Sequence, residues 1–270
     1  MKKRKADGFH AISLRFYFGL NLKGGNFMPV PKRKSNWCRR SPWGRRKFRN
    51  ITSPYLEKIK YRKATRPLKL IFSSFGFNSP VLKEKFAKVI SQDESLQEKT
   101  CLVIPYAGFD KEKTFEREKQ GLVNFGFNPD KIVFVKSRFD IVHCFPDYIY
   151  VPGGDPFKLL NAVRENEILH DIAECVRDKR AVYIGVSAGA DIATESIEYV
   201  MQLEDNNVIK DKRFGSLGLI AESILCHYDH YSYSTLKACE VVSGRSVMTI
   251  KDDELLMFED GKWSYVGEEE

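Results

Sequence analysis

Cysteine pairs with the spacing of metal or redox motifs are missing from this chain. The six cysteines form no CxxC pair, and none combines with a histidine at zinc-finger spacing. Several of them lie inside apolar runs, where cysteine acts as a small hydrophobic residue. The sequence therefore excludes a zinc finger and a CxxC redox motif, and it favours free thiols in a reducing compartment.

Long apolar runs are also missing. No stretch approaches the roughly 18 apolar residues that a membrane-spanning helix needs. The partly apolar stretch 9–22 is interrupted by Arg15 and is not followed by a clear small-residue cleavage site. We therefore expect no contact with a membrane through the folded body, no secretion, and a cytoplasmic location.

Acidic residues are scarce in the first quarter of the chain. Residues 1–67 hold 20 of the 44 Lys and Arg residues but only two of the 36 acids, Asp7 and Glu57. The net charge of +8 therefore hides a basic segment followed by an acidic body. We expect residues 1–67 to be a disordered, solvated extension; a nucleic-acid tether, a tether to anionic membranes and an organelle presequence are the alternatives.

After Pro67, short apolar runs alternate with segments of helical spacing, which predicts a second unit over residues 68–270. Continuous apolar strands between amphipathic helices are typical of a mostly parallel sheet covered on both faces. Three short runs near the end predict a small antiparallel C-terminal element. The expected strands are 68–73, 101–105, 131–135, 148–151 and 181–186, the expected helices are 80–90, 115–124 and 156–177, and the three late runs are 246–250, 254–258 and 263–266.

The stretch Gly185–Gly189 has the pattern G-x-S-x-G. An apolar strand precedes it, and a helix is expected to follow from Ala188 to Ala193, which is the setting of a nucleophile elbow. Ser187 at this turn would project above the sheet, and the N–H groups of the new helix would face an oxyanion. We therefore interpret Ser187 as a nucleophile; the alternative is a helix-capping serine in an ordinary turn.

A serine nucleophile requires a general base. The chain order Ser, then acid, then His leaves His227 and His230 as candidates, and His227 is favoured because it directly follows an apolar run. The acid is then expected between Ser187 and His227. Glu204 and Asp205 remain as alternatives there, because the acids from 191 to 198 belong to a helix that leads away from the site.

Two backbone N–H groups are expected around the oxyanion. Ala188 follows the nucleophile and would provide one. The turn Gly153-Gly154 follows the strand 148–151 and would provide the other.

Together these residues resemble the peptidase E (aspartyl dipeptidase) family, which is related to the cyanophycinases. The resemblance covers about residues 68–268, and it rests most on the elbow continued by Ala190 together with the Gly-Gly turn. The other matching pieces are Leu70–Ser74, Val103–Pro105, Ser196–Glu198, Gly218-Leu219 and His227-Tyr228.

The resemblance implies a three-layer, flavodoxin-like α/β fold similar to the class I glutamine amidotransferases. It implies a triad of Ser187, His227 and Asp205, with Asp205 preferred to Glu204 by its distance from the histidine. It further implies oxyanion donors at Gly154 and Ala188, and no metal or other cofactor. The family usually has Gly-Gly-Asn-Thr where this chain has Gly153-Gly154-Asp155-Pro156, and Cys226 stands where a proline is common.

The resemblance implies a serine exopeptidase that hydrolyses short peptides, with an amino-terminal aspartate as the family's substrate. Asp155 is expected to disfavour an acidic substrate or to favour a basic one. The alternatives are another acyl hydrolase of the cyanophycinase type, and a catalytically weak binding protein whose residues 1–67 bind nucleic acid. A monomer or a homodimer is expected, with a small peptide as the only other partner.

Overall fold

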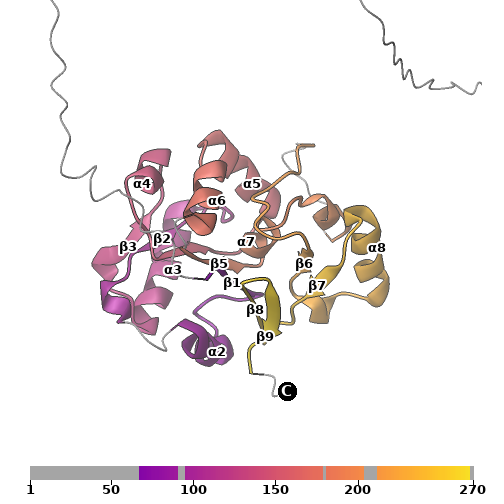
Figure 1. Cartoon of the computed structure of the whole chain (residues 1–270), viewed down its shortest axis with the longest axis horizontal. Helices are drawn as coiled ribbons and strands as arrows, with labels where there is room; N and C mark the ends of the chain where they lie inside the picture. The colour runs from indigo at the N-terminus through magenta and orange to yellow at the C-terminus, as the bar shows by residue number, and fades with distance from the viewer. Residues whose placement is uncertain (1–66, 91–94, 179–180, 204–211, 268–270) are drawn as a thin grey trace, which may run out of the picture. The chain divides into compact units, whose positions relative to one another are not determined.

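The computed structural model describes residues 67–90, 95–178, 181–203 and 212–267. The predicted extension 1–67 lies outside these residues except for Pro67, so it stays a prediction. The described part contains one seven-stranded sheet in the order β3-β2-β4-β5-β1-β8-β9 and a two-stranded sheet of β6 and β7 (Figure 1). No helix in these four ranges combines the length and the apolar character that a bilayer crossing requires.

Five parallel strands form the centre of the large sheet, and all five were predicted. Each is short, and all except β3 are almost entirely buried; in β3 only Ile132 is buried and the other two residues are half-buried. This burial follows from helices that cover both faces of the sheet. The bounds of these strands are β1 Lys69–Ser73, β2 Cys101–Val103, β3 Ile132–Phe134, β4 Tyr148–Val151 and β5 Val182–Val186.

Helices cover both faces of this sheet, as the alternation along the strands requires (Figure 1). On β1, Ile71 points to one core cluster, whereas Leu70 and Phe72 point to the other. The helices α2 Pro80–Ile90 and α3 Lys111–Phe125 pack on the first face, and α5 Pro156–Glu165 and α6 Leu169–Arg177 on the second. The three-layer α/β fold is therefore confirmed.

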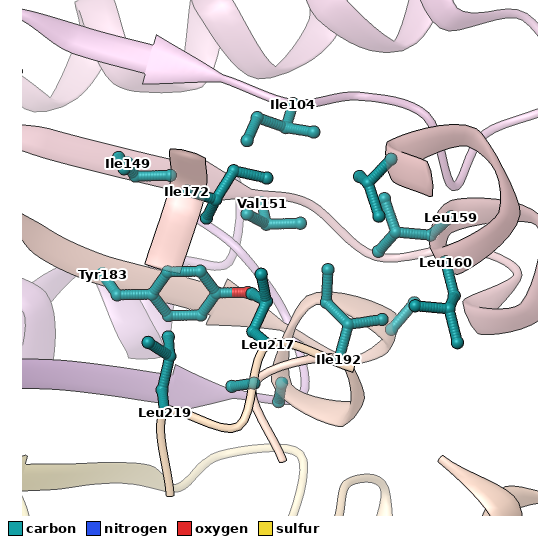
Figure 2. Packing of buried hydrophobic residues seen from close by; sticks show 14 of the residues in the cluster. Ile104, Ile149, Val151, Leu159, Leu160, Ile172, Tyr183, Ile192, Leu217 and Leu219 are labelled. Atoms are coloured by element: carbon teal, nitrogen blue, oxygen red, sulfur yellow. The ribbon is translucent and has the colours of Figure 1, made fainter. Parts of the chain in front are cut away.

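Figure 2 shows the second core cluster, where the strand side chains Ile149, Val151 and Tyr183 face Leu159 and Ile172 of the covering helices. All five side chains are fully buried. This packing holds the carboxyl ends of β4 and β5 in a fixed position, because the covering helices pack on one face of each strand and neighbouring strands pair along its edges.

Three predicted helices differ from the structure. The helix predicted at 115–124 is α3, which begins four residues earlier, at Lys111. The predicted helix 156–177 is two helices, α5 and α6, because Glu167 adopts a positive φ of 56° that an α-helix cannot continue through. The helix after the elbow, α7 Ala188–Asp191, ends before the predicted Ala193. A helix of five residues, α4 Arg138–Val142, was not predicted.

The C-terminal strands are partly as predicted. β8 Leu255–Glu259 runs antiparallel to β1, and β9 Lys262–Tyr265 runs antiparallel to β8, which confirms the antiparallel element. However, the run 246–250 belongs elsewhere: β7 Val247–Thr249 pairs in parallel with β6 Ser223–Leu225, and α8 Tyr233–Ser243 connects them. This is a β-α-β unit, whose crossover helix the sequence analysis did not recognise.

Candidate active site

The carboxyl ends of β1, β4 and β5 meet at one edge of the sheet. The register pairs Ser73 with Val186 and Val151 with Gly185, so Ser187 and the Gly153-Gly154 turn lie side by side. A Cβ added to Gly153 would lie 3.1 Å from the Cβ of Ser187. Sites in open α/β sheets form at this edge, and the predicted nucleophile lies there.

Ser187 has a strained backbone, with φ 47° and ψ −111°. Its N–H donates to the carbonyl oxygen of Ser73 at 2.9 Å, and α7 begins at the next residue. A side chain at Gly189 would collide with the carbonyl oxygen of Val151, so only glycine allows α7 to approach β4 this closely. Such a sharp strand-to-helix turn is typical of a nucleophile elbow.

His227 faces this serine. Its Nε2 lies 3.2 Å from Ser187 Oγ, a distance at which the imidazole can accept the hydroxyl proton. His227 follows β6 in the left-handed conformation, with φ 55°, and this turn points the ring toward the elbow. The structure therefore brings together the predicted nucleophile and the predicted base, although 40 residues separate them.

The carboxylate that contacts His227 is Asp252, which the sequence analysis did not consider. Its Oδ1 lies 2.7 Å from His227 Nδ1, on the opposite side of the ring from Ser187. The predicted acid, Asp205, and its alternative, Glu204, lie outside the described residues, and the Nδ1 position next to His227 is taken by Asp252. The assumption that the acid precedes the histidine in the chain does not fit this contact.

The parallel pairing of β6 with β7 explains the position of Asp252. Leu225 pairs with Thr249, so the residues that follow the two strands emerge at the same edge. His227 follows β6 by two residues and Asp252 follows β7 by three. A sequence signal existed, since an apolar run, a helical segment and a second apolar run define a β-α-β unit.

Asp252 stays ionised at neutral pH. Its burial raises the pKa of the carboxyl group, but hydrogen bonds from His230 and His227 and the charges of both rings outweigh this effect, so the pKa is lowered. A carboxylate that remains charged can hold the imidazole in one tautomer and stabilise the imidazolium that forms during proton transfer.

Ser74 connects the two loops that carry His227 and Asp252. Its buried hydroxyl accepts the His227 N–H at 2.9 Å and lies 3.1 Å and 3.2 Å from the carbonyl oxygens of Ile250 and Lys251. The carbonyl oxygen of Ser73 accepts the N–H of Ser187. The two consecutive serines at the end of β1 therefore contact Ser187, His227 and the loop that carries Asp252.

Of the residues predicted as oxyanion donors, Ala188 directly follows Ser187, and Gly154 follows Gly153, which lies against the Ser187 side chain. Gly154 has φ 143°, and a side chain there would meet the backbone of Ala107 at 2.6 Å, so this turn requires glycine. Within the described ranges, neither the N–H of Gly154 nor that of Ala188 donates a hydrogen bond to another residue. Two backbone donors beside a nucleophile are the arrangement that stabilises a tetrahedral oxyanion.

Asp155 caps a helix. Its Oδ1 accepts the N–H groups of Phe157 and Lys158, both at 2.9 Å, at the start of α5. Next to it, a pocket of about 430 Å³ opens between α5 and the loop after β2. The charged residues that line this pocket are of both signs: Asp110, Lys111, Glu112 and Lys158. We expected Asp155 to select against acidic substrates. In the structure its carboxylate accepts two backbone N–H groups of α5, which partly offset its negative charge.

Cys226 precedes the histidine but is not a rival nucleophile. Burial, with the nearby charge of Asp191, raises the pKa of its thiol well above the ordinary value. The reactive form of cysteine is the thiolate, which this environment disfavours.

One group of three side chains in the described ranges is close enough to share a metal ion, namely His170, Asp171 and Glu174 on α6. Asp171 already accepts two hydrogen bonds from Arg138, at 2.7 Å and 3.2 Å. These three residues lie on α6, whereas Ser187, His227 and Asp252 lie on other segments.

Tyr199 connects α7, the helix after the nucleophile elbow, to β6, the strand that precedes His227. Its fully buried hydroxyl lies 2.9 Å from Asp191 Oδ1 and 2.7 Å from the carbonyl oxygen of Ile224. We expect Tyr199→Phe to lower the free energy of unfolding by about 1–3 kcal/mol, because buried polar groups lose a partner. Urea unfolding followed by tryptophan fluorescence measures this loss.

The matched change Tyr233→Phe, on an exposed ring, is expected to leave the free energy of unfolding within about 0.5 kcal/mol of the wild type. Equal values for the two variants would contradict the role of the Tyr199 hydroxyl.

Comparison with known families gives one match that spans the folded body. The model of "Peptidase family S51" matches residues 70–266, from β1 to the end of β9 and the residue after it. This range includes Ser187, His227 and Asp252, as well as the Gly153-Gly154 turn.

Individual relatives agree with this match. The chain is 30% identical over 165 residues to the "Probable alpha-aspartyl dipeptidase" of Drosophila melanogaster, covering 61% of this chain and 67% of that protein. It is also 30% identical over 168 residues to the "Peptidase E" of Shewanella denitrificans, covering 60% and 67% of the two chains.

Solved structures show the same fold. A protein described as peptidase E from Listeria monocytogenes superposes with a TM-score of 0.60 at 23% identity, covering 74% of this chain and 98% of that one. A peptidase from an acI-B1 Actinobacterium superposes with a TM-score of 0.57 at 18% identity, covering 76% and 90%. At these identities the comparison supports the fold and not a particular specificity.

Proposed function

Because the chain belongs to Peptidase family S51, we propose that it is a serine-type dipeptidase with Ser187 as nucleophile, His227 as general base and Asp252 as the orienting acid. The observation that carries this proposal is the chain of two contacts, Ser187 Oγ to His227 Nε2 at 3.2 Å and His227 Nδ1 to Asp252 Oδ1 at 2.7 Å. A nucleophile, a base and an orienter within hydrogen-bond reach of one another form an acyl-transfer site.

Acylation begins when His227 removes the hydroxyl proton and Ser187 Oγ bonds to the peptide carbonyl carbon. The carbonyl oxygen becomes an oxyanion, and the N–H groups of Gly154 and Ala188 donate to it. His227 then gives its proton to the leaving amine, the carbon–nitrogen bond breaks, and an acyl-enzyme remains.

Deacylation repeats these steps with water. His227 takes a proton from a water molecule, whose oxygen attacks the ester carbonyl carbon, and the same two N–H groups stabilise the second oxyanion. His227 returns the proton to Ser187 Oγ as the ester bond breaks. The Asp252 carboxylate stabilises the imidazolium in both halves of the reaction and does not itself accept the proton.

For the substrate, we propose short peptides, with an amino-terminal aspartate as the first candidate. Two curated relatives carry the names alpha-aspartyl dipeptidase and peptidase E, and this is the support for aspartate. Asp155 does not oppose it strongly, since its carboxylate is held by two N–H groups at the start of α5.

A panel of dipeptides tests this substrate class. We expect the full-length chain to hydrolyse Asp-X peptides at least about tenfold faster, in kcat/KM, than Lys-X and isoAsp-X peptides, since a site built for one side chain leaves its polar groups unpaired with another. Release of the free amino acid is followed by chromatography, with the Ser187→Ala chain as the control. Faster cleavage of isoAsp-X would favour a cyanophycinase-type hydrolase, and faster cleavage of Lys-X would contradict aspartate specificity.

A further inference from the structure

A second histidine binds the carboxylate that orients the base. His230 Nε2 lies 2.8 Å from Asp252 Oδ2, while His227 Nδ1 occupies the other oxygen, Oδ1, at 2.7 Å. The two ring centroids are 6.3 Å apart. The His230 side chain is 65% exposed, whereas those of His227 and Asp252 are 28% and 30% exposed. His230 is therefore the most exposed of the three side chains.

The surroundings of this pair contain few other cations. Lys251 is paired with Glu254 at 3.6 Å, and Asp229 accepts the backbone N–H of Asp252 at 3.1 Å. The charged and titratable groups on the two loops that meet here are Cys226, His227, Tyr228, Asp229, His230 and Tyr231 on the first, and Lys251, Asp252, Asp253 and Glu254 on the second. Asp252 is the one that contacts both histidine rings.

We propose that His230 is a positioning residue that fixes the Asp252 carboxylate against His227 and, when protonated, competes with His227 for that single negative charge. This inference rests on the proposed function, because it assigns His230 a role only through Asp252 and His227.

Two effects follow from this geometry. A donor on Oδ2 prevents the carboxylate from rotating, so Oδ1 stays aligned with Nδ1 of His227. A positive His230 also repels a positive His227, because the two ring centroids are 6.3 Å apart and like charges at that distance oppose each other.

The rate at which a fluorophosphonate labels Ser187 tests this without knowledge of the natural substrate. In that reaction the Ser187 Oγ–phosphorus bond forms, the phosphorus–fluorine bond breaks, fluoride leaves and His227 takes the hydroxyl proton. The second-order rate constant is measured on the full-length chain from pH 4.5 to 8.5 for wild type, His230→Ala and His230→Gln.

We expect His230→Ala to lower the plateau rate constant about three- to tenfold, because one charge-assisted hydrogen bond at a largely exposed site is lost. His230→Gln keeps an N–H donor near the position of Nε2 and is expected to recover most of that loss. In both variants the pH of half-maximal rate on the acid side is expected to move up, because the like charge beside His227 has been removed. High salt should shrink this difference.

The matched control is His143→Gln, an exposed histidine on another segment, for which neither the plateau nor the half-maximal pH should change. A lower plateau with an unmoved half-maximal pH in both His230 variants would reduce His230 to a structural contact and overturn the inference. The proposed function stands or falls separately: it fails if labelling of the wild type does not depend on Ser187, and it survives if labelling depends on Ser187 but ignores His230.

Discussion

Replacing Ser187 with alanine is expected to lower peptide hydrolysis roughly 10⁴- to 10⁶-fold and to abolish labelling by a fluorophosphonate. Without the hydroxyl, His227 has no nucleophile to activate, and the acyl-enzyme cannot form. The loss should appear in kcat rather than in KM, because the rest of the site, including the proposed oxyanion donors Gly154 and Ala188, remains. Steady-state kinetics on the best dipeptide of the panel measures this split.

The fold should survive this change, since alanine occupies less space and the Ser187 contact with Ser73 is made by the backbone N–H. The thermal unfolding midpoint and the circular dichroism spectrum check this point. Ser234→Ala, at an exposed serine on α8, is the matched control and should retain full activity. Hydrolysis that persists in the Ser187→Ala chain would assign the nucleophile to another residue.

Replacing Asp252 with asparagine is expected to lower kcat about 10³- to 10⁴-fold. The amide is neutral and can present its NH₂ group to Nδ1, which would favour the tautomer of His227 that carries its proton on Nε2 and cannot accept one from Ser187. Because the pKa of the Asp252 carboxyl is lowered, the wild-type carboxylate is charged throughout the neutral range. A loss of activity just below neutral pH is therefore not assigned to protonation of Asp252.

Two further variants make this result specific. Asp253→Asn changes the exposed neighbour of Asp252 and should leave kcat within about twofold of the wild type. Asp205→Asn tests the acid that the sequence analysis preferred and should also have little effect. If Asp205→Asn caused the large loss and Asp252→Asn did not, the contact between Asp252 and His227 would have no catalytic role.

The parallel part of the fold could be predicted from the sequence because each buried strand is a compact apolar run. Tyr148–Val151 was predicted with its observed bounds, and the other four central strands to within one or two residues at each end. The break between α5 and α6 could not be predicted, since it depends on the positive φ of Glu167 and no glycine or proline marks it.

The site was predictable in the parts that a local pattern defines. Ser187 lies in a five-residue motif, and His227 follows an apolar run, so short-range signals identified both. Asp252 depends on which strand pairs with β6, a long-range feature that a run of three residues does not reveal. The run 246–250 was wrongly assigned to the antiparallel element, and for this reason Asp252 was not considered as the acid. Only the parallel pairing of β7 with β6 places Asp252 beside His227.

The most direct test of the account identifies the residue that a fluorophosphonate modifies. Wild-type and Asp252→Asn chains are treated with the same reagent, digested and mapped by tandem mass spectrometry. We expect one adduct, on Ser187, which forms at least about a hundredfold more slowly in the Asp252→Asn chain. An adduct on a different side chain, or equal labelling of Ser187 with and without the Asp252 carboxylate, would contradict the Ser187–His227–Asp252 site.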